Sequence, residues 1–156
     1  MRSTNNHAHP SCRSQRLTSN PNALTPKPLP NPGRPAPGTR PHFSHPAEEI
    51  FARILDFYGL EWEYEPCTFP LEWDEHGQIT EAFSPDFYLP GQDLYIELTT
   101  LRPQLSTFKN RRMRRMKELY PNIQVKLLKR RELHAMMVKY GLSEEAARIS
   151  GTRAQQ

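Results

Sequence analysis

The chain has 156 residues and a mass of 18.2 kDa, enough for one domain. Only 36% of the residues are hydrophobic, 16 are proline, and the mean hydropathy is −0.79, so we expect a folded domain with a disordered extension. No stretch approaches the roughly 18 apolar residues of a membrane span, which excludes a membrane protein. The cysteines, Cys12 and Cys67, lack zinc-site spacing and make no disulfide framework, so a cytoplasmic location is expected.

Residues 1–42 are predicted to be a disordered tail. They contain no acidic residue, six basic residues and nine prolines. Each proline removes a backbone donor, and few apolar side chains are present to offset the entropy of ordering. Residues 143–156 are polar and are predicted to form a second flexible tail. The folded domain is therefore expected to span residues 43–142.

The domain is predicted to begin with a helix and to continue with three strands. Ser44 or His45 precedes Pro46 at the helix start, Glu48 lies on the apolar stripe, and Gly59 ends the helix. The strands follow from alternating patterns broken by turns, and we expect them at 61–73 (interrupted at Pro66), 78–89 and 94–99.

The second half of the domain is predicted to contain a helix, a strand and a last helix. The expected ranges are 103–120, 123–128 and 132–140. The first of these helices has five residues available for its apolar stripe: Leu105, Phe108, Met113, Met116 and Leu119. The order α-β-β-β-α-β-α predicts a mixed α/β (α+β) fold, with an antiparallel three-strand meander and a fourth strand that pairs in parallel after the helical crossover.

Charge is sharply divided within this domain. Residues 43–98 hold thirteen acidic residues against Arg53 alone, whereas residues 99–142 hold twelve basic residues against Glu118 and Glu132. Two interpretations remain open. Either the acidic half holds cations while the basic half meets phosphate, or the two halves attract each other and stabilise the fold.

Two carboxylates are predicted to meet on adjacent strands. Asp86 shares a strand face with Ser84 and Tyr88, and Glu97 shares one with Tyr95. If the register brings those faces together, both carboxylates reach one cation, and hard oxygen ligands suit Mg²⁺ or Mn²⁺. Glu48 is a candidate third carboxylate. In the alternative interpretation, Asp86 caps a turn, Glu97 pairs with an arginine, and Glu48 offsets the helix dipole.

The segment Ser84-Pro85-Asp86-Phe87-Tyr88-Leu89, followed by Tyr95-Ile96-Glu97-Leu98-Thr99, resembles the signature of PD-(D/E)xK, or restriction-endonuclease-like, nucleases. The resemblance covers roughly residues 44–130 and is nearest to small bacterial members related to transposon end-cleaving and very short patch repair endonucleases. It implies a restriction-endonuclease-like core. It also implies Asp86, Glu97 and the backbone carbonyl of Leu98 as metal ligands, with Glu48 as the acid of the first helix.

The chain departs from that signature at the lysine two residues after the second acid, because Thr99 stands there. Some relatives supply the basic group from the following helix, and Lys109 is the candidate because it shares a helix face with Met113 and Met116. Lys117 and Arg112 are weaker substitutes. In the alternative interpretation, Lys109 is a solvated surface charge.

The predicted nucleic-acid-binding residues come mainly from the basic helix and the segment after the fourth strand: Arg111, Arg112, Arg114, Arg115, Lys117, Lys129, Arg130 and Arg131. The alternative is a solvated helix face that complements the acidic half.

The first function expected is a metal-dependent endonuclease that acts on DNA or RNA. Its expected partner is nucleic acid, foremost DNA. The protein is expected to act either as a homodimer or in a complex with a partner protein. The alternative is a catalytically inactive nucleic-acid-binding or protein-docking module, including a regulatory appendage of another enzyme such as a phosphoribosyltransferase.

Overall fold

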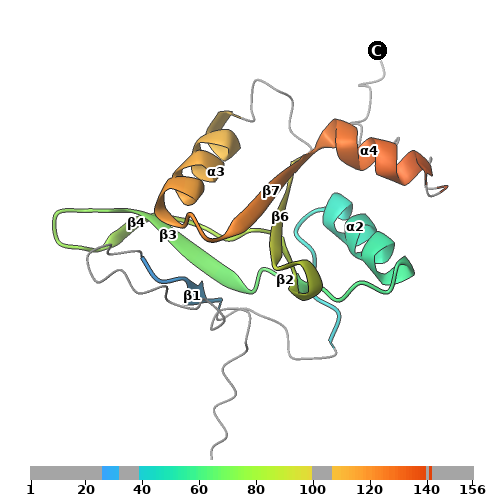
Figure 1. Cartoon of the computed structure of the whole chain (residues 1–156), viewed down its shortest axis with the longest axis horizontal. Helices are drawn as coiled ribbons and strands as arrows, with labels where there is room; N and C mark the ends of the chain where they lie inside the picture. Colours follow the sequence, from blue (N-terminus) through green and yellow to red (C-terminus); the bar gives the residue numbers. More distant parts are fainter. Residues whose placement is uncertain (1–25, 32–38, 100–106, 140, 142–156) are drawn as a thin grey trace, which may run out of the picture.

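The computed structural model describes residues 26–31, 39–99, 107–139 and 141, and they form a mixed α/β fold with two sheets (Figure 1). One sheet has the strand order β1-β3-β4 and the other the order β2-β5-β6-β7. The strands are β1 (Leu29–Pro30), β2 (Glu63–Tyr64), β3 (Cys67–Trp73), β4 (Ile79–Phe83), β5 (Phe87–Leu89), β6 (Leu94–Thr99) and β7 (Gln124–Lys129). The helices are α2 (Pro46–Phe57), α3 (Thr107–Leu119), α4 (Arg130–Lys139) and the 3-10 turn η1 (Pro90–Gln92).

The predicted start of the first helix is confirmed, with His45 as the N-cap. The His45 side chain accepts a hydrogen bond from the backbone N–H of Ala47, and the Glu48 carboxylate accepts one from the backbone N–H of His45, so the two residues form a capping box. Pro46 occupies the first turn, where a missing backbone donor costs nothing. The helix therefore begins where its sequence signals place it.

The predicted second strand is two strands in two different sheets. β4 pairs with β3, whereas β5 pairs with β2 and β6, and the chain crosses between the sheets at Ser84-Pro85-Asp86. Pro85 has no backbone donor for a ladder and is fully buried at this crossing. The meander pairs antiparallel and β7 pairs parallel to β6, as predicted.

The four-stranded sheet has helices on both faces (Figure 1). One core cluster joins α2 and α4 to Phe87, Leu89, Ile96 and Leu98 of the sheet. The other joins α3 and β3 to the residues that alternate with these, including Tyr88 and Tyr95. Since side chains alternate along a strand, the even-numbered face of β5 and the odd-numbered face of β6 look toward α3.

Several predictions need correction or fall outside the described residues. The two-residue strand β1 pairs with β3 and lies within the predicted disordered tail. Phe108 is 52% exposed rather than core, because its ring packs against the guanidinium group of Arg112, 4.2 Å from the ring centre. Cys67 is fully buried and disulfide-bonded, contrary to the expectation from sequence. Cys12, Pro103 and Leu105 lie outside the described residues.

The remaining helix boundaries shift by a few residues. α4 begins two residues before the predicted start, at Arg130, and Gly141 follows it with the positive φ of 73° that glycine accepts readily. None of the described helices combines the length and the apolar character needed to cross a membrane.

Candidate functional site

The register of β5 and β6 brings Asp86 and Glu97 to neighbouring positions. Phe87 pairs with Ile96 and Tyr88 with Tyr95, so the residues one step further, Asp86 and Glu97, follow in the same register. The rings of Tyr88 and Tyr95 are 4.6 Å apart on the face that looks toward α3. Because side chains alternate along each strand, the two carboxylates share that face, as the sequence predicts.

Asp86 is held by the backbone of the neighbouring strand. It is only 8% exposed, and its Oδ2 accepts a hydrogen bond of 2.7 Å from the backbone N–H of Leu98. Burial raises the pKa of Asp86 to about 8, and the negative charge of Glu97 adds to that rise, while the Leu98 hydrogen bond opposes it. Without a cation, the site therefore favours a proton on Asp86 at neutral pH.

Glu97 has one oxygen paired and one oxygen without a partner. The residue is 4% exposed, and its Oε1 lies 2.5 Å from Nζ of Lys109. Its Oε2 is buried and accepts no hydrogen bond from any described residue. Burial raises the pKa of Glu97, although the charge of the Lys109 ammonium group and its hydrogen bond oppose this rise. A buried carboxylate oxygen without a donor is costly unless a ligand meets it.

Lys109 reaches the carboxylate pair from α3, as its helix position predicts. Its Nζ also donates a hydrogen bond of 2.7 Å to the backbone carbonyl of Leu98. The ammonium group thus contacts the two oxygens, Glu97 Oε1 and Leu98 O, that the nuclease resemblance assigns to a metal. Its side chain is 28% exposed, so the group lies at the solvent side of the pair. Thr99 is buried and brings no charge.

In the structure Glu48 is hydrogen-bonded away from the pair, and its role as a third metal ligand stays a prediction. Its Oε2 accepts hydrogen bonds from the hydroxyl of Tyr64 at 2.7 Å and from the backbone of Ser44 at 3.0 Å and His45 at 3.3 Å. The reason is geometric, because α2 packs on the sheet face opposite to the one that carries Asp86. The charge of Glu48 still helps to raise the pKa of Asp86.

Glu65 is an acid beside the pair that the sequence reasoning missed. Its backbone N–H donates to the carbonyl of Asp86 at 2.9 Å, and its φ of 40° lies in the left-handed region. Burial raises its pKa, and the charges of Glu48 and Glu97 add to the rise. The signal in the sequence that could have pointed to Glu65 is Pro66, which directly follows Glu65 and interrupts the alternating strand. Across the described ranges, no three His, Cys, Asp or Glu side chains are arranged to hold a metal.

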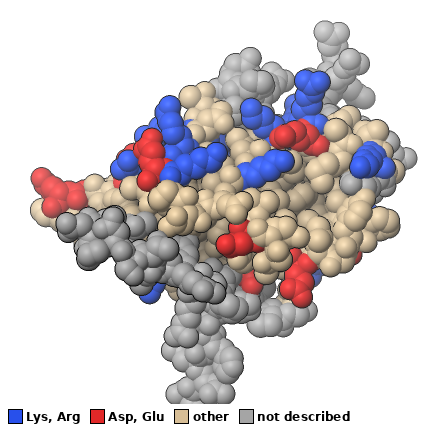
Figure 2. All heavy atoms as spheres, viewed as in Figure 1, with Lys and Arg blue, Asp and Glu red and all other residues tan. Residues whose placement is uncertain are grey.

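Three of the predicted nucleic-acid-binding arginines are used within the fold. Arg111 and Arg112 both contact the Glu81 carboxylate, at 2.6 and 2.9 Å, and Arg115 contacts Glu118 at 3.3 Å. Figure 2 shows basic and acidic side chains intermixed where α3 meets the β3–β4 hairpin. For Arg111 and Arg112 the structure favours the interpretation in which the charged halves stabilise each other, whereas the Arg115–Glu118 pair lies within the basic half.

The other predicted basic residues remain on the surface. Arg114, Lys117, Lys129 and Arg131 are exposed, and Arg130 is half-buried. In the portion of the chain described here, none of the five is in an ion pair. Comparisons of the chain with protein-family models, with curated proteins and with solved structures gave no match.

Proposed function

We propose that this protein is a metal-dependent endonuclease that hydrolyses phosphodiester bonds in DNA or RNA, on a restriction-endonuclease-like core. The observation that carries the proposal is the buried pair of Asp86, directly before β5, and Glu97 on β6, in which one carboxylate oxygen of Glu97 has no donor among the described residues. Two carboxylates that share a face and favour a bound proton are suited to exchange that proton for a cation.

The donor atoms at the pair fit Mg²⁺ or Mn²⁺. Asp86, Glu97 and the carbonyl of Leu98 supply hard oxygen ligands, which both ions prefer to nitrogen or sulfur. The unpartnered Oε2 of Glu97 is the atom most in need of a positive ligand. When bound, such an ion would lower the pKa of a coordinated water and neutralise charge on the phosphodiester.

Lys109 is the group proposed to replace the lysine that the signature carries at the position of Thr99. Its ammonium group lies against Glu97 and the Leu98 carbonyl, at the solvent side where a phosphodiester would approach. From there it would stabilise negative charge that develops on the phosphate and orient the attacking water. Thr99 is buried and uncharged, so it is not able to perform this role.

The test is cleavage of supercoiled plasmid, linear duplex and single-stranded DNA and RNA, with Mg²⁺ or Mn²⁺ and with chelator. We expect products only with a divalent ion, and we expect Asp86→Asn and Glu97→Gln each to abolish them. These substitutions preserve side-chain size, and circular dichroism checks that both variants fold. Full metal-dependent cleavage by the double variant would overturn the proposal.

A second function, an inactive nucleic-acid-binding or docking module, is favoured by one observation. The Lys109 ammonium already occupies Glu97 Oε1 and the Leu98 carbonyl, so the pair has a counter-charge without any metal. This alternative predicts binding of nucleic acid with no product on any substrate. It also predicts that calorimetry detects no Mn²⁺ binding that depends on Asp86.

A further inference from the structure

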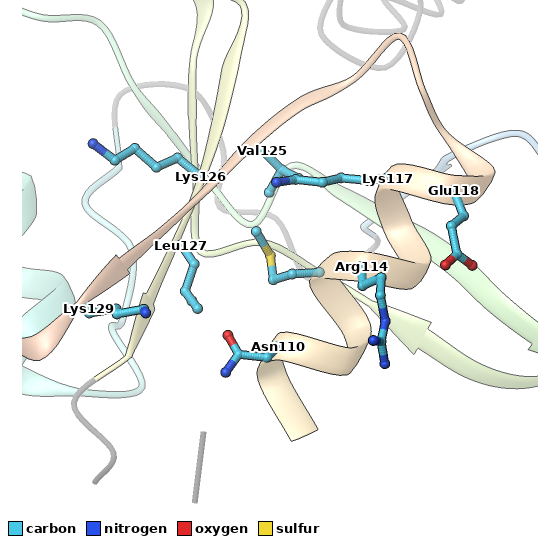
Figure 3. A pocket seen from close by; sticks show the side chains of 9 residues that line it. Asn110, Arg114, Lys117, Glu118, Val125, Lys126, Leu127 and Lys129 are labelled. Carbon is cyan, nitrogen blue, oxygen red and sulfur yellow. The ribbon is translucent and has the colours of Figure 1, made fainter. Parts of the chain in front are cut away.

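A groove between α3 and β7 is lined by four basic side chains that form no ion pair with the described residues. It has a volume of about 660 Å³. Its cationic residues are Arg114 and Lys117 from the helix and Lys126 and Lys129 from the strand (Figure 3). Lys117 extends toward β7 and Lys129 extends from β7 toward the helix, whereas the charged ends of Arg114 and Lys126 point away from the space between the two elements. Two walls of the same groove therefore carry positive charge.

The four cations of this groove are not neutralised by the described part of the protein. None of them is in an ion pair there, and all four side chains are exposed. The one acidic residue that lines the groove, Glu118, is paired with Arg115 at 3.3 Å. Arg111 and Arg112, by contrast, are paired with Glu81. The basic surface of α3 is thus divided into a structural part and a free part.

The groove lies directly beside the carboxylate pair. In the parallel register of β6 and β7, Glu97 pairs with Leu127, which lines the groove, and Thr99 pairs with Lys129. On α3, Lys109 contacts Glu97, and the next residue, Asn110, lines the groove. A nucleic-acid strand that passes the carboxylate pair along α3 would therefore meet the groove lining at Asn110, one residue after Lys109.

We propose that this groove binds the phosphates of a nucleic-acid strand next to the phosphodiester that would lie at the proposed cation site of Asp86 and Glu97. This proposal rests on the proposed function, because it names where the substrate strand runs. Lysine and arginine on two walls suit a repeating anion, and none of the described residues that line the groove is aromatic and able to stack on bases. Such contacts fix the position of a strand and carry little sequence information.

The experiment measures binding of labelled single-stranded and duplex oligonucleotides by fluorescence anisotropy, in chelator, so that no cleavage is needed. The groove variant is Lys117→Ala with Lys129→Ala. The matched control is Lys27→Ala with Lys139→Ala, which removes the same charge at exposed positions outside the groove lining. We expect the groove variant to weaken duplex binding about tenfold or more at about 0.1 M salt and to lower the salt slope by about 2.

The control variant should change affinity several-fold less than the groove variant, and Lys117→Arg with Lys129→Arg should restore binding. Equal losses in the two alanine variants would overturn the proposal, because net charge rather than the groove would then explain binding. So would displacement of the oligonucleotide by poly-glutamate at the same charge concentration, which would identify an acidic protein as the better partner.

The failure of this proposal is distinguishable from failure of the proposed function. Asp86→Asn with Glu97→Gln should lose cleavage, and its oligonucleotide binding in chelator should still weaken when Lys117→Ala and Lys129→Ala are added. If the unmodified protein binds through the groove but cleaves nothing, the nuclease proposal fails and the groove stands. If it cleaves and the groove variant binds and cleaves normally, the groove proposal fails alone.

Discussion

Nζ of Lys109, on α3, lies 2.5 Å from Oε1 of Glu97, on β6. The same ammonium group donates to the carbonyl of Leu98, the next residue on that strand. A side chain from the basic half of the domain thus meets the buried acid of the other half. The contact joins the stability of the fold to the chemistry of the proposed site, and the first prediction separates these two effects.

Replacement of Lys109 by methionine should lower both cleavage and stability. The stability loss is expected to be about 1–3 kcal/mol near neutral pH, because a buried carboxylate loses its counter-charge. It should shrink at acidic pH, where Glu97 takes up a proton. Urea unfolding and plasmid cleavage are the two measurements. If Lys109→Met leaves cleavage unchanged and Thr99→Lys raises it, Lys109 has no role in the reaction.

Replacement of Asp86 by asparagine should stabilise the metal-free protein, and more so at higher pH. The pKa of Asp86 is raised to about 8 by burial, from an unfolded value of 3.8. The folded state therefore holds a proton that the unfolded state has lost, and stability of the unmodified protein falls as pH rises from about 4 to about 8. Thermal unfolding in chelator at about pH 5 and about pH 8 should show a larger gain in Tm at the higher pH.

The same variant provides a test for the cation. Excess Mn²⁺ should raise the Tm of the unmodified protein, since a ligand that binds only the folded state stabilises it. It should leave the Tm of Asp86→Asn unchanged. An equal Tm increase in both proteins would place the ion elsewhere.

Replacement of Glu48 separates a helix cap from a metal ligand. Glu48→Ala should cost about 1 kcal/mol, because the capping box and the bond from Tyr64 are lost. Glu48→Gln keeps an oxygen that accepts the hydrogen bonds of the capping box and of Tyr64, so its cleavage should stay close to that of the unmodified protein. A Glu48→Gln variant that folds normally but no longer cleaves would return Glu48 to the ligand set.

Replacement of Glu81 by glutamine should weaken the contact between the β3–β4 hairpin and α3. The hydrogen bond from Arg112, with the charge of Arg111, holds the pKa of Glu81 below its usual value. The contribution of this contact to stability is therefore present above about pH 4.5 and is lost as the pH falls further. We expect a loss of about 0.5–1.5 kcal/mol in urea unfolding near neutral pH, reduced by added salt. Nucleic-acid affinity should change little, in contrast to the groove variant.

Local signals in the sequence were sufficient for much of the fold. Pro46 after a capping residue located α2, and the alternating pattern of residues 94–99 located β6. The turn before β6 is short, so the antiparallel neighbour of Glu97 was readily deduced. Asp86 and Glu97 were therefore placed on neighbouring strands without coordinates.

Long-range partners were not predictable in the same way. The Glu81 contacts with Arg111 and Arg112 join residues 30 and 31 positions apart, and many other acids were available to either arginine. Glu48 looked inward on its helix stripe, yet Tyr64, sixteen residues away, determines where its carboxylate points. The crossing of the chain between two sheets at Pro85 depends on which strand β4 selects, and no local pattern encodes that choice.

The contacts of the β3–β4 hairpin also determine the rotational setting of α3. Arg111 and Arg112 follow Lys109 by two and three positions, within a single turn of the helix, and both are anchored on Glu81. The hairpin thus helps to hold Lys109 in its position beside Glu97. A molecule bound at the exposed end of this hairpin, where Trp73 and Ile79 lie, would be expected to change the position of Lys109 against Glu97 without contact with either carboxylate.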